Sequence, residues 1–218
     1  MTHKFFEDKI PHNGYTYEEF QKMTKEQIEK TDPQNLDEDG KEHFEYTKLN
    51  MYRSSRIEKN YTVTDELKKE VEKIKEPQLW MIITENWCGD SAQNLPYIAK
   101  IAALNSNIDL RIILRDSNPG IMDLYLTNGT RSIPILVSFD AAGNEKFKWG
   151  PRPDAAQALI KQWKADGIVK PELYEKLHLW YSKNKGRNIE EEMLKLIKNI
   201  NQVAYENRNP FSTRRQKR

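Results

Sequence analysis

The chain has a single cysteine among 218 residues, and this scarcity excludes several kinds of chemistry. One cysteine excludes an internal disulfide and any metal site built from several cysteines. The histidines (His3, His12, His43 and His178) are scattered, with no pair at the spacing that two ligands on one helix need, so no zinc or haem site is expected. We therefore expect no metal and no bound cofactor. Any redox role must rest on Cys88, with the partner sulfur supplied by another molecule.

Long apolar runs and a strong charge of one sign are also missing. No run approaches the roughly 20 residues needed to cross a bilayer, and the opening "MTHKFFEDKIPHNG" lacks the apolar region of a secretory signal. The formal net charge is only +2, which gives no general attraction to nucleic acid or membranes. The basic stretch at 207–218 is interpreted as a flexible, soluble tail rather than as an arm that binds acidic partners. We expect a cytoplasmic protein that binds neither membrane nor nucleic acid; its oligomeric state is left open.

What is present indicates a soluble globular protein. Hydrophobic residues make up 37%, charged residues 31% and aromatic residues 10%, which fits a packed core with much solvated helix surface. Residues 1–61 are polar and compatible with helices, and Thr16 with Glu19 forms a possible capping box. No glycine-rich linker follows this region, and its apolar positions are few. We interpret 1–61 as an N-terminal helical extension packed on the main domain.

Residues 62–167 alternate between helix and strand patterns. A helix is expected after Thr64, and the apolar run "QLWMIIT" at 78–84 is typical of a buried parallel strand. A turn with Cys88 leads into a second helix, and "IDLRIILRD" alternates apolar and charged residues as a strand does. A short helix, a hairpin around "AAGN" and a helix at 154–167 complete the pattern. This order predicts an α/β fold with helices on both faces of a mixed central sheet, to which the hairpin adds an antiparallel edge.

Residues 168–206 return to helix in two segments separated by "KNKGRN". Each carries an apolar face, which we interpret as packing against the central domain rather than as a binding groove. The residues of the two faces are Leu173, Leu177, Trp180 and Tyr181, and then Met193, Ile197 and Ile200. The tryptophans Trp80, Trp149 and Trp163 are expected in the core, and Arg131, Lys148 and Arg152 are expected to be solvated charges rather than ligands of an acidic substrate.

The stretch "ENWCGDSAQNLP" places Cys88 where a turn meets the start of a helix. Unpaired N–H groups and the positive end of the helix dipole stabilise a thiolate there, and can lower a thiol pKa from about 8.5 to roughly 3.5–7.5. Gly89 permits a tight turn and a close approach of a partner's backbone. Trp87 would form an apolar wall beside the sulfur. We therefore expect Cys88 to be partly exposed and reactive near neutral pH.

The motif "WCGDS" resembles the active site of the thioredoxin family, which reads Trp-Cys-Gly-Pro-Cys. Pro96 follows Cys88 by eight residues, where thioredoxins carry a helix-kinking proline. "NPG" at 118–120 follows the next strand as it does in that family, and "TRSIPILVSF" is similar to the family's "IRGIPTLLLF". Gly150 matches a glycine of the final strand. The resemblance covers about residues 62–166 and leaves both flanks unmatched.

This resemblance implies a thioredoxin fold with helical extensions and assigns roles to individual residues. The Ile133–Pro134 bond would be the family's cis bond, in a loop that faces the sulfur and pairs with the backbone of a peptide substrate. Cys88 would be the nucleophile, and the Ser91 hydroxyl would help to stabilise its thiolate. The expected substrate groove comprises Trp87, Gly89, Asp90, Ser132, Ile133 and Pro134.

The departures from the family pattern decide the expected chemistry. Ser91 replaces the resolving cysteine, so a mixed disulfide at Cys88 has no internal thiol to release it. Asp90 replaces the family's proline; it stabilises the first helical turn but opposes a thiolate if it points toward the sulfur. Ile82 and Ile112 match the buried Asp and Lys of thioredoxins, so that proton-transfer apparatus is absent. Ser91 itself could be natural or an introduced Cys→Ser change, and the neighbouring departure at Asp90 favours natural divergence.

We therefore expect a monothiol thiol–disulfide exchange protein acting on protein disulfides or mixed disulfides. An external low-molecular-weight thiol, such as glutathione, would release the product as co-substrate. The alternative is a thioredoxin-fold binding or adaptor module without redox turnover. Handling of glutathione or an iron–sulfur cluster is less favoured, because Trp87 and the proline contexts resemble thioredoxin rather than monothiol glutaredoxin. A peroxidase is disfavoured because Glu85 stands where peroxiredoxins need threonine.

Overall fold

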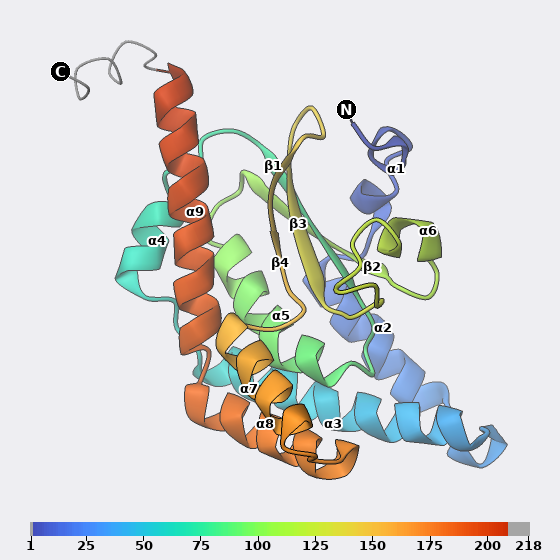
Figure 1. The fold of residues 1–218 in the computed structure, drawn as a ribbon. Coiled ribbons are helices and arrows are strands. Elements are labelled where there is room, and N and C mark those ends of the chain that lie inside the picture. Colours follow the sequence, from blue (N-terminus) through green and yellow to red (C-terminus); the bar gives the residue numbers. More distant parts are fainter. Residues whose placement is uncertain (1, 209–218) are drawn as a thin grey trace.

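The computed structural model describes residues 2–208, with a four-stranded mixed sheet at the centre (Figure 1). Its strands are β1 (Gln78–Thr84), β2 (Ile108–Leu114), β3 (Ile135–Asp140) and β4 (Glu145–Trp149). They lie in the spatial order β2-β1-β3-β4. The β1–β2 pair is parallel, whereas the β1–β3 and β3–β4 pairs are antiparallel. This confirms the predicted α/β class and the antiparallel hairpin at the end of the sheet.

Strand β1 occupies the centre of the sheet because its residues are apolar on both faces. Side chains alternate along a strand, so Trp80 and Ile82 point to one face and Met81 and Ile83 to the other. All of these side chains are fully buried. The two faces consequently carry two separate apolar cores.

The core on the Trp80 face is covered by helices from across the chain. The helix α5 (Gly89–Ala102) and the shorter α4 (Asp65–Val71) supply Ile98 and Leu67. The predicted apolar face of α9 (Arg187–Arg208) packs here too, through Met193 and Ile197. Thr64 is the N-cap of α4 as predicted, although its side chain makes no capping hydrogen bond.

The opposite core is covered by short elements. Phe5 and Phe6 of α1 (Lys4–Glu7) and Met122 of α6 (Pro119–Met122) pack against Phe139 of β3. Cys88 belongs to this second core. The N-terminal segment therefore contributes part of the hydrophobic interior, rather than resting on a finished domain.

The rest of the N-terminal extension closes one sheet edge and one flank of α5. It comprises α2 (Tyr17–Lys30), α3 (Glu38–Asn60) and two short 3₁₀ turns, η1 (Pro11–Asn13) and η2 (Pro33–Asn35). The predicted capping box is present: Glu19 N donates to Thr16 Oγ1 at 3.1 Å, and Thr16 N donates to Glu19 Oε2 at 2.8 Å. Just before it, Tyr15 exchanges two backbone hydrogen bonds of 2.8 Å with Ile112 on the edge strand β2. An exposed strand edge is a site of unwanted pairing, and this bridge covers part of it.

The helices α7 (Asp154–Ala165) and α8 (Lys170–Asn184) form a hairpin with an apolar cluster of its own. The cluster consists of Ala156, Ile160, Leu173, Leu177 and Tyr181. The face of α8 therefore packs on α7 rather than on the sheet. Within residues 2–208, none of the helices has the length and hydropathy that crossing a membrane requires. The last two described residues, Asn207 and Arg208, belong to α9, and the remainder of the predicted tail lies outside the described residues.

Candidate functional site

The folded chain brings Cys88 and the predicted proline loop together. Cys88 is the N-cap residue of α5, and its Sγ donates a hydrogen bond to the carbonyl oxygen of Ile133 at 3.4 Å. The Ile133–Pro134 peptide bond is cis, as the resemblance implied. The nucleophile candidate and the loop that would face a substrate are therefore in direct contact.

The thiol of Cys88 is buried, with 8% of the residue exposed. Burial, followed by the charge of the Asp90 carboxylate, raises its pKa from an ordinary value of 9.0 to about 11. The Ser91 hydroxyl and the first backbone N–H groups of α5 favour the thiolate, but they are outweighed. The expectation of a partly exposed, acidic thiol was wrong for this conformation. Loss of hydration destabilises the thiolate more than the N-terminus of the helix stabilises it.

Asp90 is also buried and has two partners. Its Oδ2 lies 2.5 Å from Nη2 of Arg152, and its Oδ1 accepts a hydrogen bond of 2.7 Å from the hydroxyl of Tyr181. Burial raises the pKa of Asp90, and Arg152 and Tyr181 oppose that rise. Asp90 therefore anchors a buried polar network instead of lining an open groove. Arg152, expected to be a solvated charge, is half-buried in this network.

Arg152 reaches Asp90 because the chain turns sharply after β4. Gly150 has a φ of +120°, and a Cβ atom there would lie 2.2 Å from the carbonyl oxygen of Pro134. Only glycine fits such a contact with the cis-proline loop. The sequence match at Gly150 thus has a physical basis in the packing of the two loops.

The space beside Gly89 is occupied by the protein itself. A Cβ at Gly89 would lie 3.0 Å from Cε1 of His178, on α8, and 3.7 Å from Nη1 of Arg53, on α3. Burial, reinforced by the Arg53 charge, lowers the pKa of His178 to about 4, so the imidazole is neutral at pH 7. The approach that Gly89 was expected to offer a partner's backbone is therefore filled by two of the chain's own helices.

Trp87 precedes Cys88 in the chain and remains partly exposed. Its ring stacks on His43 of α3 with centroids 4.6 Å apart, and the guanidinium of Arg115 lies 4.8 Å from its centroid. It also lines a cavity of about 360 Å³ between the N-terminal helices and the loop before Cys88. The tryptophan forms the predicted apolar wall, since it packs against the core that contains Cys88.

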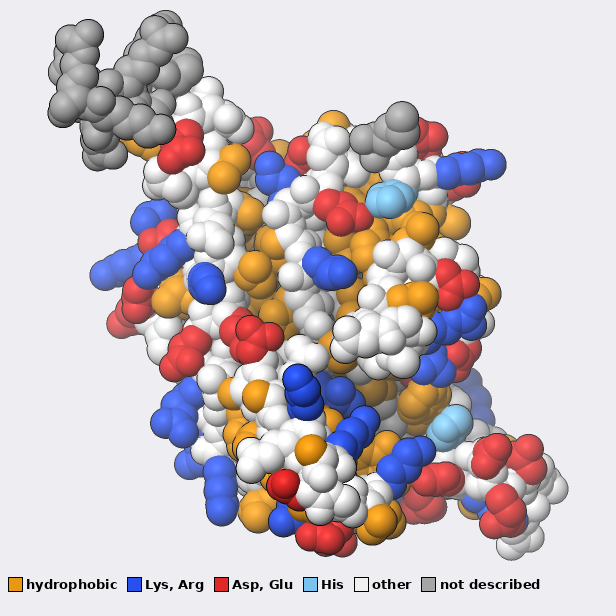
Figure 2. Space-filling model, viewed as in Figure 1, with side chains coloured by type: hydrophobic (Ala, Val, Ile, Leu, Met, Phe, Trp, Pro, Cys, Tyr) orange, Lys and Arg blue, Asp and Glu red, His pale blue; other side chains and the backbone are white. Residues whose placement is uncertain are grey.

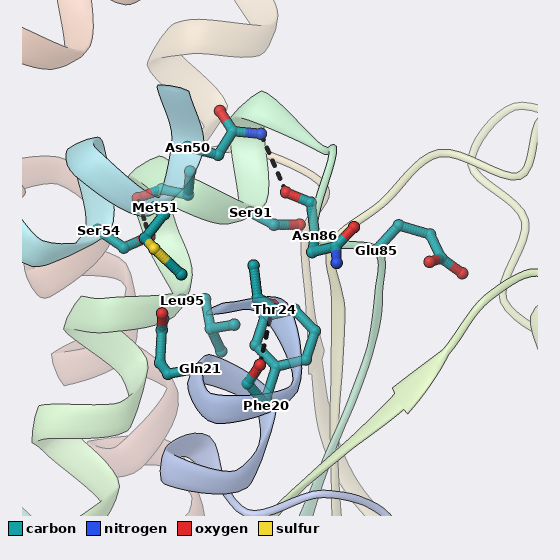
Figure 3. A pocket seen from close by; sticks show the side chains of 11 residues that line it. Phe20, Gln21, Thr24, Asn50, Met51, Ser54, Glu85, Asn86, Ser91 and Leu95 are labelled. Carbon is teal, nitrogen blue, oxygen red and sulfur yellow. Dashed lines mark hydrogen bonds between the residues drawn. The ribbon is translucent and has the colours of Figure 1, made fainter. Parts of the chain in front are cut away.

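Ser91 turns its hydroxyl toward the interior. It shares a short, buried hydrogen bond with the hydroxyl of Thr84, at the end of β1. It also lines a cavity of about 20 Å³ between α2, α3 and α5 (Figure 3), which has room for about one water molecule. The position of the missing resolving cysteine is thus not open to a substrate.

Asn86 ties the N-terminal extension to the loop before Cys88. Asn50 Nδ2 of α3 donates to the Asn86 carbonyl oxygen at 3.1 Å (Figure 3), and Asn86 Nδ2 donates to Gln27 Oε1 of α2 at 2.7 Å. Sequence reasoning did not identify these residues. Hydrogen bonds between polar residues 36 and 59 positions apart leave no periodic pattern to detect.

The predicted substrate groove is only partly accessible. Trp87, Gly89 and Ser132 keep some exposure, whereas Asp90, Ile133 and Pro134 are buried. The Ser132 hydroxyl lies 2.8 Å from that of Thr130. The structure therefore brings the predicted site residues together in a closed arrangement.

Comparison with known proteins agrees with this geometry. A family model described as thioredoxin matches residues 39–164, more than half of the chain, and it begins inside α3. A protein of unknown function from Pseudomonas aeruginosa has a similar structure, with a TM-score of 0.57 at 16% identity over 88% of this chain and 96% of that one. An HIV epitope-scaffold gives a TM-score of 0.55 at 16% identity, over 88% and 97%. No curated protein matched the sequence. The match over the sheet, the Cys88 turn and the proline loop shows that the chain belongs to the thioredoxin family.

Proposed function

We propose that this protein is a monothiol thiol–disulfide exchange protein with Cys88 as its nucleophile. The observation that carries the proposal is the contact of Cys88 Sγ, at the start of α5, with the carbonyl that precedes the cis proline. In a thioredoxin fold this places the sulfur beside the backbone that a substrate strand would meet. Protein disulfides and mixed disulfides are the proposed substrates, in the cytoplasm, where small thiols are abundant.

The exchange has two steps. The Cys88 thiolate attacks one sulfur of a substrate disulfide, forming a mixed disulfide and releasing the other sulfur as a thiolate. Because Ser91 cannot attack this bond, an external thiolate such as that of glutathione attacks the substrate sulfur of the mixed disulfide. Cys88 then leaves as a thiolate, and the substrate carries the new disulfide to the small thiol. No net oxidation or reduction occurs, because the original substrate disulfide is replaced by a disulfide between the substrate and the small thiol.

The burial of Cys88 limits how this chemistry starts. With a thiol pKa of about 11, only about one molecule in 10,000 holds the thiolate at pH 7 in the closed arrangement. Both the sulfur and the substrate path must therefore become exposed before attack. Cys88 therefore reacts slowly in the closed arrangement and faster after a local rearrangement exposes it.

The same burial favours a second candidate, an adaptor that binds a partner without thiol turnover. The buried thiol and the adjacent acid are what a disused nucleophile would retain as core packing. In that case Trp87 and Ser132, which stay partly exposed, would contact the partner.

The two candidates separate in one experiment. The protein is incubated with glutathione disulfide, the adduct on Cys88 is identified by mass spectrometry, and its release by added glutathione is timed. Cys88→Ser serves as the matched control with no nucleophilic sulfur. We expect a single adduct on the native chain, its release by glutathione, and neither in the variant. If the native chain is still unmodified after long incubation, the result favours the adaptor function instead.

A further inference from the structure

The α7–α8 hairpin covers the end of α5 that carries Cys88. Figure 1 shows both helices beneath the lower end of α5. The hydroxyl of Tyr181 donates to Asp90 and accepts a hydrogen bond of 3.1 Å from Nδ2 of Asn94, one turn further along α5. His178 of the same helix lies against Gly89. The hairpin therefore closes over the first turn of α5 from the solvent side.

The apolar contacts of the hairpin lie mainly within the hairpin. Its buried residues form a cluster that includes no strand residue and nothing from α5. Leu179, on the other side of α8, is exposed, and so is Tyr174, two turns before Tyr181. A movement of the hairpin away from α5 would leave this cluster and both sheet cores intact. The two sheet cores, whose burial stabilises the domain, contain no residue of the hairpin.

Several polar contacts join the hairpin and the turn before it to α5. These contacts include the Tyr181–Asp90 hydrogen bond and the Arg152–Asp90 ion pair, which lies just before the start of α7. Within residues 2–208, the buried atoms without a hydrogen-bond partner include Arg152 Nε, Asn94 Oδ1 and His178 Nδ1, all in this interface. Each unsatisfied polar group penalises the closed state relative to a hydrated open one. The closed interface is thus held by a few strong polar bonds and weakened by its unsatisfied neighbours.

The end of α8 offers a place for the chain to bend. Lys185 has a φ of +52° and Gly186 a φ of +82°, so the helix stops and the chain turns before α9 begins. Gly186 packs on the ring of Tyr97, where a Cβ would lie 2.2 Å from Cε1. The helix α9 stays fixed in the sheet core beyond this turn.

We propose that the α7–α8 hairpin is a lid over Cys88, latched by Tyr181 and Arg152 on Asp90, and that the thiol meets its substrate only when the lid opens. The lid would regulate the proposed function, and its biological purpose rests on that function. It accounts for an acid at the position where the family has proline, because a carboxylate can bind both latch groups. It also protects a single thiol, which has no internal partner, from indiscriminate oxidation. Figure 2 shows Lys and Arg side chains in the lower central part of this face of the molecule.

The test measures how fast Cys88 is alkylated in Tyr181→Phe. This variant keeps the ring and removes the hydroxyl that bonds Asp90 and Asn94. Iodoacetamide serves as the small reagent and a polyethylene-glycol maleimide as the bulky one. We expect both rates to rise at least tenfold over the native chain. Tyr174→Phe is the matched control, because Tyr174 is an exposed tyrosine two turns before Tyr181 on the same helix, and its rates are expected to stay within twofold of the native chain.

Hydrogen exchange separates opening of the lid from loss of the whole fold. In Tyr181→Phe, amides of α8 should exchange faster while those of β1 keep their native protection. Unchanged alkylation rates in Tyr181→Phe would overturn the lid, and so would equal acceleration of exchange in α8 and β1. The proposed function is tested separately. If the lid opens but Cys88 forms no adduct with glutathione disulfide, thiol–disulfide exchange is refuted and the lid is not.

Discussion

At the scale of single residues, Cys88 shows two opposed influences on one thiol. The N-terminus of α5 and the Ser91 hydroxyl stabilise the thiolate, whereas burial and Asp90 destabilise it. The second pair is stronger, because the pKa rises from 9.0 to about 11. Two pKa units correspond to about 2.7 kcal/mol between the protonation states. In this conformation Cys88 is therefore held in its protonated thiol form.

This pKa difference predicts a stability change at high pH. Between pH 9 and 11 the folded chain keeps the Cys88 proton, while the unfolded chain loses it. The contribution is fully present below pH 9 and is lost as the pH rises through 11, by about 2–3 kcal/mol. Urea unfolding of the native chain and Cys88→Ala should show their difference in free energy shrinking by this amount from pH 8 to 11. Parallel pH curves for the two proteins would contradict the raised thiol pKa.

Asp90 is predicted to affect both stability and thiol acidity. Asp90→Asn removes the charge that opposes the thiolate, so the pKa of Cys88 should fall, as measured by the pH dependence of alkylation. The same change leaves half-buried Arg152 without its counter-charge and should cost about 3 kcal/mol of unfolding free energy.

The matched control for this substitution is Asp123→Asn. Asp123 pairs with Arg131 at 2.7 Å, but both side chains are about half exposed. An exposed pair contributes little, so the unfolding free energy should hardly change. Equal losses in the two variants would show that burial of the Asp90 pair is not what makes it important.

At the scale of elements, the site is built where loops at the ends of three strands meet. The turn after β1 carries Cys88, the loop before β3 carries the cis proline, and the turn after β4 carries Arg152. Gly150 allows the last two to touch, since its backbone meets the Pro134 carbonyl. The packing of these loops positions the thiol, and no single helix or strand does so alone.

Gly150→Ala is predicted to disturb both loops. The added Cβ would lie 2.2 Å from a backbone oxygen at a φ of +120°, so we expect a loss of about 3 kcal/mol or more in unfolding free energy. Gly129→Ala is the matched control, because Gly129 also has a positive φ, +75°, but nothing lies within 4 Å of its Cβ position. That variant should lose only about 1 kcal/mol. Chemical denaturation of both variants measures the difference, and similar losses would rule out the loop contact as the cause.

At the scale of the whole molecule, the extensions and the family domain share their hydrophobic cores. Phe5 and Phe6 complete the core on one face of the sheet, and Tyr15 covers the edge of β2. The helix α3 holds the loop before Cys88 through Asn50. At the other end of the chain, α9 completes the core on the opposite face.

Phe6→Ala is accordingly predicted to destabilise the whole protein by about 3–4 kcal/mol, the usual cost of deleting a buried phenylalanine. Tyr52→Ala is the control, since Tyr52 is an aromatic residue of the same extension that is 69% exposed. Its unfolding free energy should change by less than about 0.5 kcal/mol. A small loss in Phe6→Ala would mean that the extension is only an accessory to an independent domain.

The sequence predicted the local features well. Short patterns or the family motif predicted the bounds of β1 at 78–84, the capping box at Thr16, the helix N-terminus at Cys88 and the cis bond before Pro134. These features depend on neighbouring residues or on a motif of a few letters. Apolar period and capping chemistry act over one or two turns, which is the range that a sequence displays directly.

The tertiary structure alone decided the state of the site. Tyr181 bonds Asp90 from 91 residues away, and Arg152 joins them after a turn that only Gly150 permits. The motif predicted an exposed, acidic thiol because it specifies the helix terminus beside the sulfur. It does not specify what covers that terminus, and hydration of the sulfur depends on elements distant in the chain. The sequence by itself thus determined the family fold and the place of its single thiol at a helix N-terminus. Packing determined that this thiol is buried, because desolvation is a property of the assembled interior.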